Sequence, residues 1–198
     1  MSDNCHLKLD YLNQYAGGLT FIETGTYMGA GVKRALEYGF RNIHSIEIDD
    51  NFYELNVNQF KENSEVRLWH GDSVELLPEI MKEIGEDEAV FWLDAHASGP
   101  LKGGIHGPSP LLNELRITSG ELSLSFDKGE MKPTFIKRKV NTHTIFIDDR
   151  RLLGSAEWGF VKEQDVMMLL NFINPEYKFF FLDGHVQEDI ICATTRIS

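Results

Sequence analysis

Three carboxylates and two arginines that follow apolar runs form the part of this sequence best suited to chemistry. Asp94 ends one apolar run, and Asp148 and Asp149 lie at the end of another. If the two runs are neighbouring strands of a parallel sheet, their carboxyl ends meet and the acids converge. Carboxylate oxygens are preferred ligands of Mg²⁺, Mn²⁺ and Ca²⁺, so the three acids are candidate metal ligands. Arg150 and Arg151 follow directly, and ion pairs with these arginines are the alternative to a metal.

A glycine-rich turn lies between an apolar run and a helix-like stretch near the N-terminus. Its spacing is E-x-G-x-x-x-G, from Glu23 through Gly25 to Gly29. Glycines let the backbone approach a ligand, and the N-terminus of the following helix offers free N–H groups. The spacing matches neither the dinucleotide fingerprint G-x-G-x-x-G nor a P-loop. The sequence therefore predicts a nucleotide-binding loop, with a plain tight turn as the alternative.

Acids also end the second and third apolar runs. Glu47 lies 22 residues after Gly25, where an acid can accept hydrogen bonds from both hydroxyls of a ribose. The alternative is a solvent-facing loop acid. Asp72 and Ser73 follow the third run, and Ser73 is expected to cap the next helix. Because acids gathered on one sheet edge repel one another, we expect a ligand at this edge.

The apolar periodicity alternates between strands and helices along the chain. Short apolar runs predict strands at 19–23, 42–47, 65–69, 89–94, 142–148, 177–182 and 189–195. Apolar residues at helical spacing predict helices at 5–16, 31–38, 50–63, 74–84, 111–117 and 163–173. This alternation predicts an α/β fold with a Rossmann-like, doubly wound sheet. The sheet is expected to be mostly parallel, with an antiparallel strand near the C-terminus and helices on both faces.

Residues 118–141 break this rhythm. Alternating apolar residues on either side of Asp127-Lys128-Gly129 predict a β-hairpin inserted into a single domain of residues 1–198. The insertion is the most basic stretch of the chain, and it is interpreted as a solvated arm, a substrate lid or an oligomer contact. The glycine-rich residues 97–108 are predicted to form a mobile lid.

Composition and charge exclude several classes of protein. The chain has 198 residues and a net charge of −12, which argues against nonspecific binding to nucleic acid or to an anionic membrane. Two cysteines, Cys5 and Cys192, are too few for a disulfide framework or a cysteine metal cluster. The sequence shows no signal peptide and no membrane-spanning run, so we expect a cytoplasmic protein.

The strand-end motifs together resemble those of the class I S-adenosylmethionine (SAM) methyltransferases. In order they are Glu-Thr-Gly-Thr-Tyr-Met-Gly, Ser-Ile-Glu-Ile, His-Gly-Asp-Ser, Phe-Trp-Leu-Asp-Ala-His and Ile-Phe-Ile-Asp-Asp. They look like a group that often accompanies sugar or polysaccharide biosynthesis genes, and the resemblance covers 19–117 and 142–196. It implies SAM as cofactor, bound by Glu23, Thr24, Gly25, Thr26, Tyr27, Gly29, Glu47, Ile48, Asp72, Ser73 and Asp94. Tyr27 departs from the family pattern, because many members have a glycine there.

The acids Asp94, Asp148 and Asp149 further resemble the metal site of O-methyltransferases of the catechol type and of those acting on macrolide and aminocoumarin sugars. In such enzymes the metal binds two neighbouring hydroxyls of the substrate and lowers the pKa of the one to be methylated. The resemblance implies O-methylation of a small molecule or carbohydrate, assisted by Mg²⁺ or another divalent cation.

His96 lies two residues after Asp94, and the two form the predicted catalytic pair, with His96 as the general base. The alternatives are a histidine that only hydrogen-bonds its loop, and His106 as the base. Two functions stay open: an active O-methyltransferase, and a methyltransferase-fold protein that binds SAM or a nucleotide without catalysis. The substrate is expected over residues 97–108 and 118–141, or in a groove shared with another subunit of a homo-oligomer.

Overall fold

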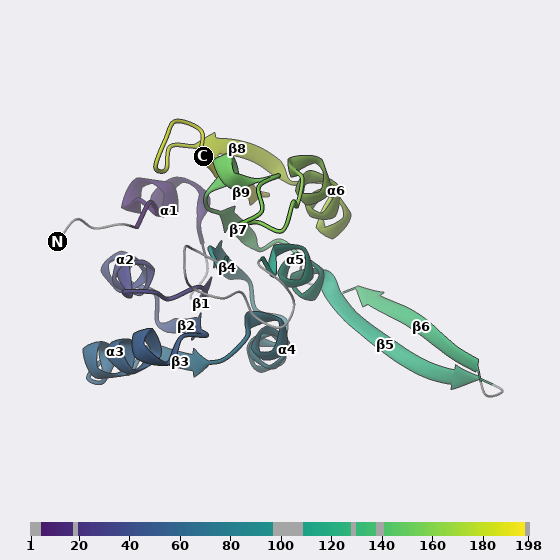
Figure 1. Cartoon of the computed structure of the whole chain (residues 1–198), viewed down its shortest axis with the longest axis horizontal. Helices are drawn as coiled ribbons and strands as arrows, with labels where there is room; N and C mark the ends of the chain where they lie inside the picture. The colour runs from purple at the N-terminus through teal and green to yellow at the C-terminus, as the bar shows by residue number, and fades with distance from the viewer. Residues whose placement is uncertain (1–4, 18–19, 97–108, 128–129, 138–140, 197–198) are drawn as a thin grey trace.

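A seven-stranded sheet forms the centre of the computed structural model, which describes residues 5–17, 20–96, 109–127, 130–137 and 141–196 (Figure 1). The strand order is β3-β2-β1-β4-β7-β9-β8. The strands are β1 (Thr20–Thr24), β2 (Asn42–Glu47), β3 (Val66–His70), β4 (Ala89–Leu93), β7 (Thr144–Ile147), β8 (Lys178–Leu182) and β9 (Ile190–Thr194). Strand β9 is antiparallel to both of its neighbours, and the other neighbouring pairs are parallel.

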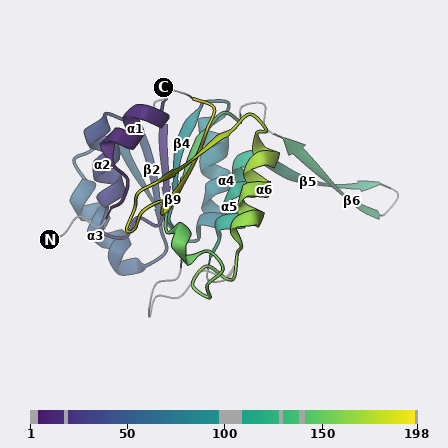
Figure 2. The same ribbon diagram turned by 90° about the horizontal axis from the view of Figure 1, so that it is seen from above.

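Helices cover both faces of this sheet (Figures 1 and 2). On one face lie α1 (Leu9–Tyr15), α2 (Ala30–Tyr38) and α3 (Asp50–Phe60). On the other lie α4 (Ser73–Ile84), α5 (Leu111–Ser119) and α6 (Glu163–Ile173). A short 3₁₀ helix, η1 (Arg150–Leu152), follows β7. The predicted fold class, a doubly wound sheet with helices on both faces, is confirmed.

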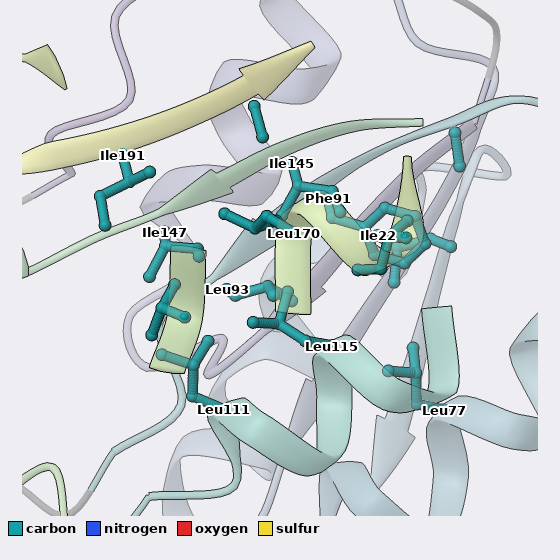
Figure 3. Close-up of a cluster of buried hydrophobic side chains, with 14 of the residues drawn as sticks. Ile22, Leu77, Phe91, Leu93, Leu111, Leu115, Ile145, Ile147, Leu170 and Ile191 are labelled. Carbon is teal, nitrogen blue, oxygen red and sulfur yellow. The ribbon is translucent and has the colours of Figure 1, made fainter. Parts of the chain in front are cut away.

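The alternation of side chains along the strands divides the core into two clusters. Phe21 packs on the side of α1, α2 and α3, whereas the next residue, Ile22, packs on the side of α4, α5 and α6. Figure 3 shows the second cluster, whose helical members include Leu77, Leu115 and Leu170. Each large apolar side chain buried in this way stabilises the fold by about 1.5–3 kcal/mol. The two clusters fix the positions of the strand ends, where the candidate site lies.

Two predictions about helix starts were wrong. The first helix spans Leu9–Tyr15 rather than 5–16, because the backbone at its N-cap is extended. The helix after β3 is capped by Asp72, whose carboxylate accepts a hydrogen bond from a backbone N–H of the first turn at 2.9 Å. Ser73 is therefore the first helical residue and not the cap. A carboxylate serves as an N-cap as well as a hydroxyl does.

The two C-terminal strands form one edge of the sheet. Strand β8 is outermost, and β9 lies between β8 and β7, with Cys192 paired to both Phe146 and Phe180. The antiparallel strand is therefore second from the edge. The strand predicted at 142–148 is shorter, since β7 ends at Ile147. Asp148 and Asp149 consequently lie just beyond the carboxyl end of β7.

A hairpin projects from the body of the molecule at α5 (Figures 1 and 2). Its strands are β5 (Gly120–Asp127) and β6 (Glu130–Lys137). The lid predicted at 97–108, including His106, lies outside the described residues. Within the described ranges, no helix combines the length and hydropathy needed to cross a membrane.

Candidate active site

The loop after β1 depends on two glycines whose positions admit no side chain. Gly25 has a φ of 86° and Gly29 a φ of 76°, in the left-handed region that favours glycine. A Cβ on Gly25 would lie 2.9 Å from the backbone oxygen of Asp94. A Cβ on Gly29 would lie 2.3 Å from Oδ1 of Asn56. The loop therefore packs directly on the end of β4 and on α3.

Tyr27, which stands where the family pattern has a glycine, adopts the backbone conformation that glycine favours. Its φ is 47°, which is unusual for a bulky residue. Two side chains stabilise it: the Tyr27 N–H donates to Oε2 of Glu47 at 2.7 Å, and the Asn56 amide donates to the Tyr27 carbonyl at 2.6 Å. The ring packs on Phe52, with centroids 4.5 Å apart. The departure from the pattern is thus compensated locally.

Glu47 supports this loop from the end of β2. Its Oε2 accepts the Tyr27 N–H, and its Oε1 accepts the Asp49 N–H at 2.9 Å. Glu47 is 7% exposed, so it is not the solvent-facing loop acid of the alternative interpretation. Each oxygen keeps a lone pair that can accept a ligand hydroxyl. The next residue, Ile48, is 46% exposed and offers an apolar surface beside the acid.

Glu23 lies inside the protein, behind the loop. Its carboxylate accepts a hydrogen bond from Ser45 Oγ at 2.5 Å, and that hydroxyl lies 2.6 Å from the hydroxyl of Thr26. A Cβ on Gly31 would lie 1.8 Å from Oε1 of Glu23. Burial raises the pKa of Glu23 to about 8, although the bond from Ser45 opposes this shift. Glu23 and Thr26 therefore stabilise the loop and the start of α2 by buried hydrogen bonds and packing, on the side away from solvent.

A second buried acid, Glu114 of α5, lies beside the ends of β1 and β3. Burial raises its pKa to about 7. The hydroxyls of Ser73 and Thr24 lower that pKa in part, although neither reaches hydrogen-bonding geometry with the carboxyl. Nearby, Oδ1 of Asp72 caps α4, while its Oδ2 is buried without a hydrogen-bond partner among the described residues. A buried acceptor of this kind suits an amino group of a ligand.

The ends of β4 and β7 bring an imidazole and carboxylates together. The two strands are paired neighbours, as the predicted metal site requires. Nε2 of His96 lies 3.0 Å from Oδ2 of Asp149 and 3.7 Å from Oδ1 of Asp94. These three residues form a group whose candidate ligand atoms lie within 4.8 Å of one another. The His96 ring also packs against Trp158, with centroids 5.0 Å apart.

His6, which the sequence did not single out, completes a second group. Its Nδ1 lies 3.0 Å from Oδ2 of Asp148, although 142 positions separate the two residues in the chain. His6, Asp148 and Asp149 also have their candidate ligand atoms within 4.8 Å of one another. Asp149 therefore belongs to both groups. A lone histidine before the first helix carries no local signal that could have revealed this contact.

The arginine alternative holds for one acid of the cluster. Arg151 donates to Oδ1 of Asp149 and also to the buried carboxylate of Asp189. Arg150 pairs instead with an acid at the start of α6, at 3.0 Å. The other two predicted metal ligands form no ion pair with an arginine in the described part of the chain. The arginines therefore neutralise the cluster only in part.

The environment of the cluster shifts the pKa values of Asp94 and Asp149 in opposite directions. Burial, followed by the charges of Asp148 and Asp149, raises the pKa of Asp94 well above its ordinary value, although 32% of the Asp94 side chain is exposed. Burial also acts to raise the pKa of Asp149, but hydrogen bonds from His96 and Arg151 outweigh it and lower that pKa. Carboxyls with opposite shifts are typical of sites for acid–base chemistry.

No protein-family model and no curated protein matches this chain, whereas solved structures do. A Staphylococcus aureus protein assigned as a caffeoyl-CoA O-methyltransferase has a TM-score of 0.51 at 12% identity, covering 89% of this chain and 76% of that protein. Geranyl diphosphate methyltransferase in complex with SAM has a TM-score of 0.51 at 9% identity, with coverages of 86% and 62%. Spermidine synthase from Thermotoga maritima has a TM-score of 0.55 at 7% identity, with coverages of 93% and 56%. The chain has the fold of the class I SAM-dependent methyltransferases.

Within this methyltransferase fold, the predicted site residues divide into two adjacent groups. The first, named the cofactor group after its predicted role, lies at the ends of β1, β2 and β3 and comprises Gly25, Tyr27, Gly29, Glu47, Ile48 and Asp72. Buried next to it are Glu23, Thr24, Thr26 and Ser73. The acid–imidazole group, at the ends of β4 and β7, comprises Asp94, His96, Asp148 and Asp149, together with His6. Gly25 joins the two groups through its contact with the backbone of Asp94.

Proposed function

We propose that this protein is a SAM-dependent methyltransferase that methylates a hydroxyl of a small molecule or sugar, assisted by a divalent cation. The observation that carries the proposal is the close approach of Gly25, in the glycine loop, to the backbone of Asp94. A cofactor bound on the loop would then have its methyl group beside His96. The fold alone does not define the reaction, because a spermidine synthase and a [4+2]-cyclase share it.

The cofactor group supports SAM as the ligand. Gly25 and Gly29 have positive φ, and a Cβ at either would clash with Asp94 or Asn56, so they hold the loop in the tight turn on which SAM would bind. Glu47 has lone pairs for the ribose hydroxyls, and exposed Ile48 can pack on the adenine ring. Asp72 has a buried, unpaired oxygen among the described atoms that can accept from the adenine amino group.

His96 supplies the proton acceptor in this proposal. During transfer the substrate oxygen bonds to the methyl carbon as the sulfur–carbon bond breaks, and the hydroxyl proton must leave. The imidazole accepts that proton, and Asp149 at 3.0 Å stabilises the resulting imidazolium. Asp94, at 3.7 Å, reinforces this effect when ionised. Positioned general bases of this type contribute about 10²–10⁴-fold to rate.

The carboxylates at the ends of β4 and β7 fit a divalent cation. Asp94, Asp148 and Asp149 supply hard oxygen donors, and Asp149 is common to two groups with ligand-like spacing. A bound cation would supply Lewis-acid chemistry that lowers the pKa of a substrate hydroxyl. A cation site of this kind would favour a substrate with two neighbouring hydroxyls, such as a catechol or a sugar diol.

The proposal is tested in two steps. Calorimetry with S-adenosylhomocysteine (SAH) should detect binding to the purified protein. Formation of SAH from SAM is then measured over a panel of catechols and sugar diols, with and without divalent cation. Turnover that falls by about 10² or more in His96→Asn supports the proposal. Absence of SAH binding would overturn it.

The second candidate is a methyltransferase-fold protein that binds SAM or a nucleotide without catalysis. The ion pair of Arg151 with Asp149 favours it, because a pair of this kind can stabilise the sheet edge alone. SAH binding together with no turnover over the whole panel would favour this candidate.

A further inference from the structure

The segment before α1 holds His6 against the end of β7. Leu7, the next residue, is fully buried in the core cluster of α1, α2 and α3. The hydroxyl of Tyr11, in α1, donates to the carbonyl of Asp183 at 2.9 Å. These two anchors fix the segment, so the imidazole of His6 is positioned by the fold.

Asp148 and Asp149 each have one oxygen oriented by a donor and the other directed to an imidazole. In Asp148, Oδ1 accepts the Asp149 N–H at 2.8 Å, and Oδ2 lies 3.0 Å from Nδ1 of His6. In Asp149, Oδ1 accepts from Arg151, and Oδ2 lies 3.0 Å from Nε2 of His96. Carboxylates that bind metals are commonly oriented in this way by outer hydrogen bonds.

The spacing of these atoms matches that of ligands around a small ion. Ligand atoms about 2.1 Å from an octahedral ion lie about 3 Å apart when adjacent and about 4.2 Å apart when opposite. His6 and Asp148 are 3.0 Å apart, and all candidate ligand atoms of His6, Asp148 and Asp149 lie within 4.8 Å. An ion could therefore replace the direct contact with little movement of the side chains.

The local charge also favours a cation. Asp148, Asp149 and Asp189 are acids of this region, and Arg151 pairs with Asp149 and Asp189. The excess of carboxylates over that arginine leaves a negative site that a divalent ion would neutralise.

We propose that His6, Asp148 and Asp149 bind a divalent transition-metal ion, with His6 as its imidazole ligand. This inference deepens the metal part of the proposed function. Imidazole nitrogen suits ions such as Fe²⁺, Co²⁺ and Zn²⁺, whereas Mg²⁺ prefers oxygen ligands alone. His96 then remains the proton acceptor, and the segment before α1 becomes part of the active site.

The test is a calorimetric titration of the metal-free protein with Co²⁺ and, separately, with Mg²⁺, in the absence of SAM. We expect Co²⁺ to bind at least about tenfold more tightly than Mg²⁺. His6→Gln keeps a donor for Asp148 but removes the imidazole, and it should lower Co²⁺ affinity about 10- to 100-fold. The visible absorption of bound Co²⁺ should change in parallel.

The matched control is His70→Gln, because His70 is a half-exposed histidine that pairs with Asp50 at 3.0 Å. The Co²⁺ affinity of this variant should equal that of the wild type.

Equal affinities for Co²⁺ and Mg²⁺, or unchanged Co²⁺ binding in His6→Gln, would overturn the inference. SAH binding is measured on the same samples and verifies that His6→Gln is folded. Co²⁺ binding that depends on His6 in a protein that does not bind SAH would support this inference while overturning the proposed function. SAH binding without Co²⁺ binding would overturn this inference and support the SAM-binding part of the proposed function.

Discussion

The cofactor group and the acid–imidazole group lie on the same edge of the sheet but hold their acids differently. In the cofactor group, Glu47 accepts hydrogen bonds from the backbone N–H groups of Tyr27 and Asp49, and Asp72 accepts one from a backbone N–H in the first turn of α4. In the acid–imidazole group, Asp148 and Asp149 meet imidazoles. Backbone donors are fixed by the fold, whereas an imidazole can bind a proton or a metal ion. The first arrangement therefore suits recognition, and the second suits chemistry.

The largest effect is expected where the two groups touch. In Gly25→Ala, the new Cβ would lie 2.9 Å from the backbone oxygen of Asp94, at a residue with a φ of 86°. We expect a loss of about 2–4 kcal/mol in the free energy of unfolding, together with loss of both SAH and metal binding. Urea denaturation and calorimetry measure these effects. The control is Gly39→Ala, which has a φ of 99° but nothing within 4 Å of the new Cβ.

Gly39→Ala should lose only about 1 kcal/mol, from backbone strain alone. Equal losses in the two variants would contradict the close contact between the groups.

Asp149→Asn should distinguish the two groups, because it should weaken metal binding and leave SAH binding nearly unchanged. Asp149 is shared by both histidine-containing groups, so removing its charge should lower divalent-metal affinity about 100-fold. Its φ of 54° is one that asparagine tolerates, so the fold should be kept. SAH affinity, measured by calorimetry, should change by less than about threefold. A large loss of SAH affinity would show that the two groups are not independent.

Glu47→Gln should have the converse effect. Two backbone N–H groups donate to Glu47, one to each oxygen, and a glutamine amide has only one oxygen to accept them. One N–H of the loop would then face an NH₂ group. We expect SAH affinity to fall about tenfold or more, which corresponds to about 1.4 kcal/mol or more. Metal affinity should be unchanged, and an unchanged SAH affinity would remove the ribose role of Glu47.

A pH-dependent effect on stability is expected at Glu114, the buried acid beside the cofactor group. Its pKa rises from 4.5 to about 7 on folding, because burial disfavours the charged form. Between these two pH values the folded protein keeps a proton that the unfolded chain releases, so this acid makes the folded state less stable as pH rises. Below pH 4.5 the carboxyl is neutral in both states and its contribution is constant. Above about pH 7 the loss is complete.

Glu114→Gln mimics the neutral acid, so its stability relative to the wild type should increase from about pH 4.5 to about pH 7. Urea denaturation over this range measures the difference. Glu54→Gln, at an exposed position of α3, is the control and should give a constant difference. A constant difference for Glu114→Gln would show that this carboxyl is already ionised in the folded protein.

The sequence predicts the glycine turn and the strand ends of the cofactor group because their signals are local. A strand, a glycine turn and a helix start are adjacent in the chain, and the acid of the next strand follows at a regular distance. Alternation of helices and strands likewise predicts the sheet. The predicted N-cap of α4 was wrong by one residue, since Asp72 and Ser73 are both residues that favour N-caps.

The remaining features depend on contacts between distant parts of the chain. His6 meets Asp148 across 142 positions, and nothing near His6 in the sequence indicates a partner. Glu114 looks like a solvated charge on a helix, and only the packing of α5 against the sheet reveals that it is buried. The positive φ of Tyr27 depends on Glu47 and Asn56, whose side chains hydrogen-bond its backbone from β2 and α3.

A crystal structure of the protein with SAH and Co²⁺ tests the account most directly, because one map reports on both groups. We predict nucleoside density on the glycine loop, with the ribose on Glu47 and the adenine near Asp72. We also predict an anomalous peak within about 2.2 Å of ligand atoms from His6, Asp148 and Asp149. SAH bound elsewhere, or an anomalous peak away from these three residues while their direct contacts persist, would contradict the account.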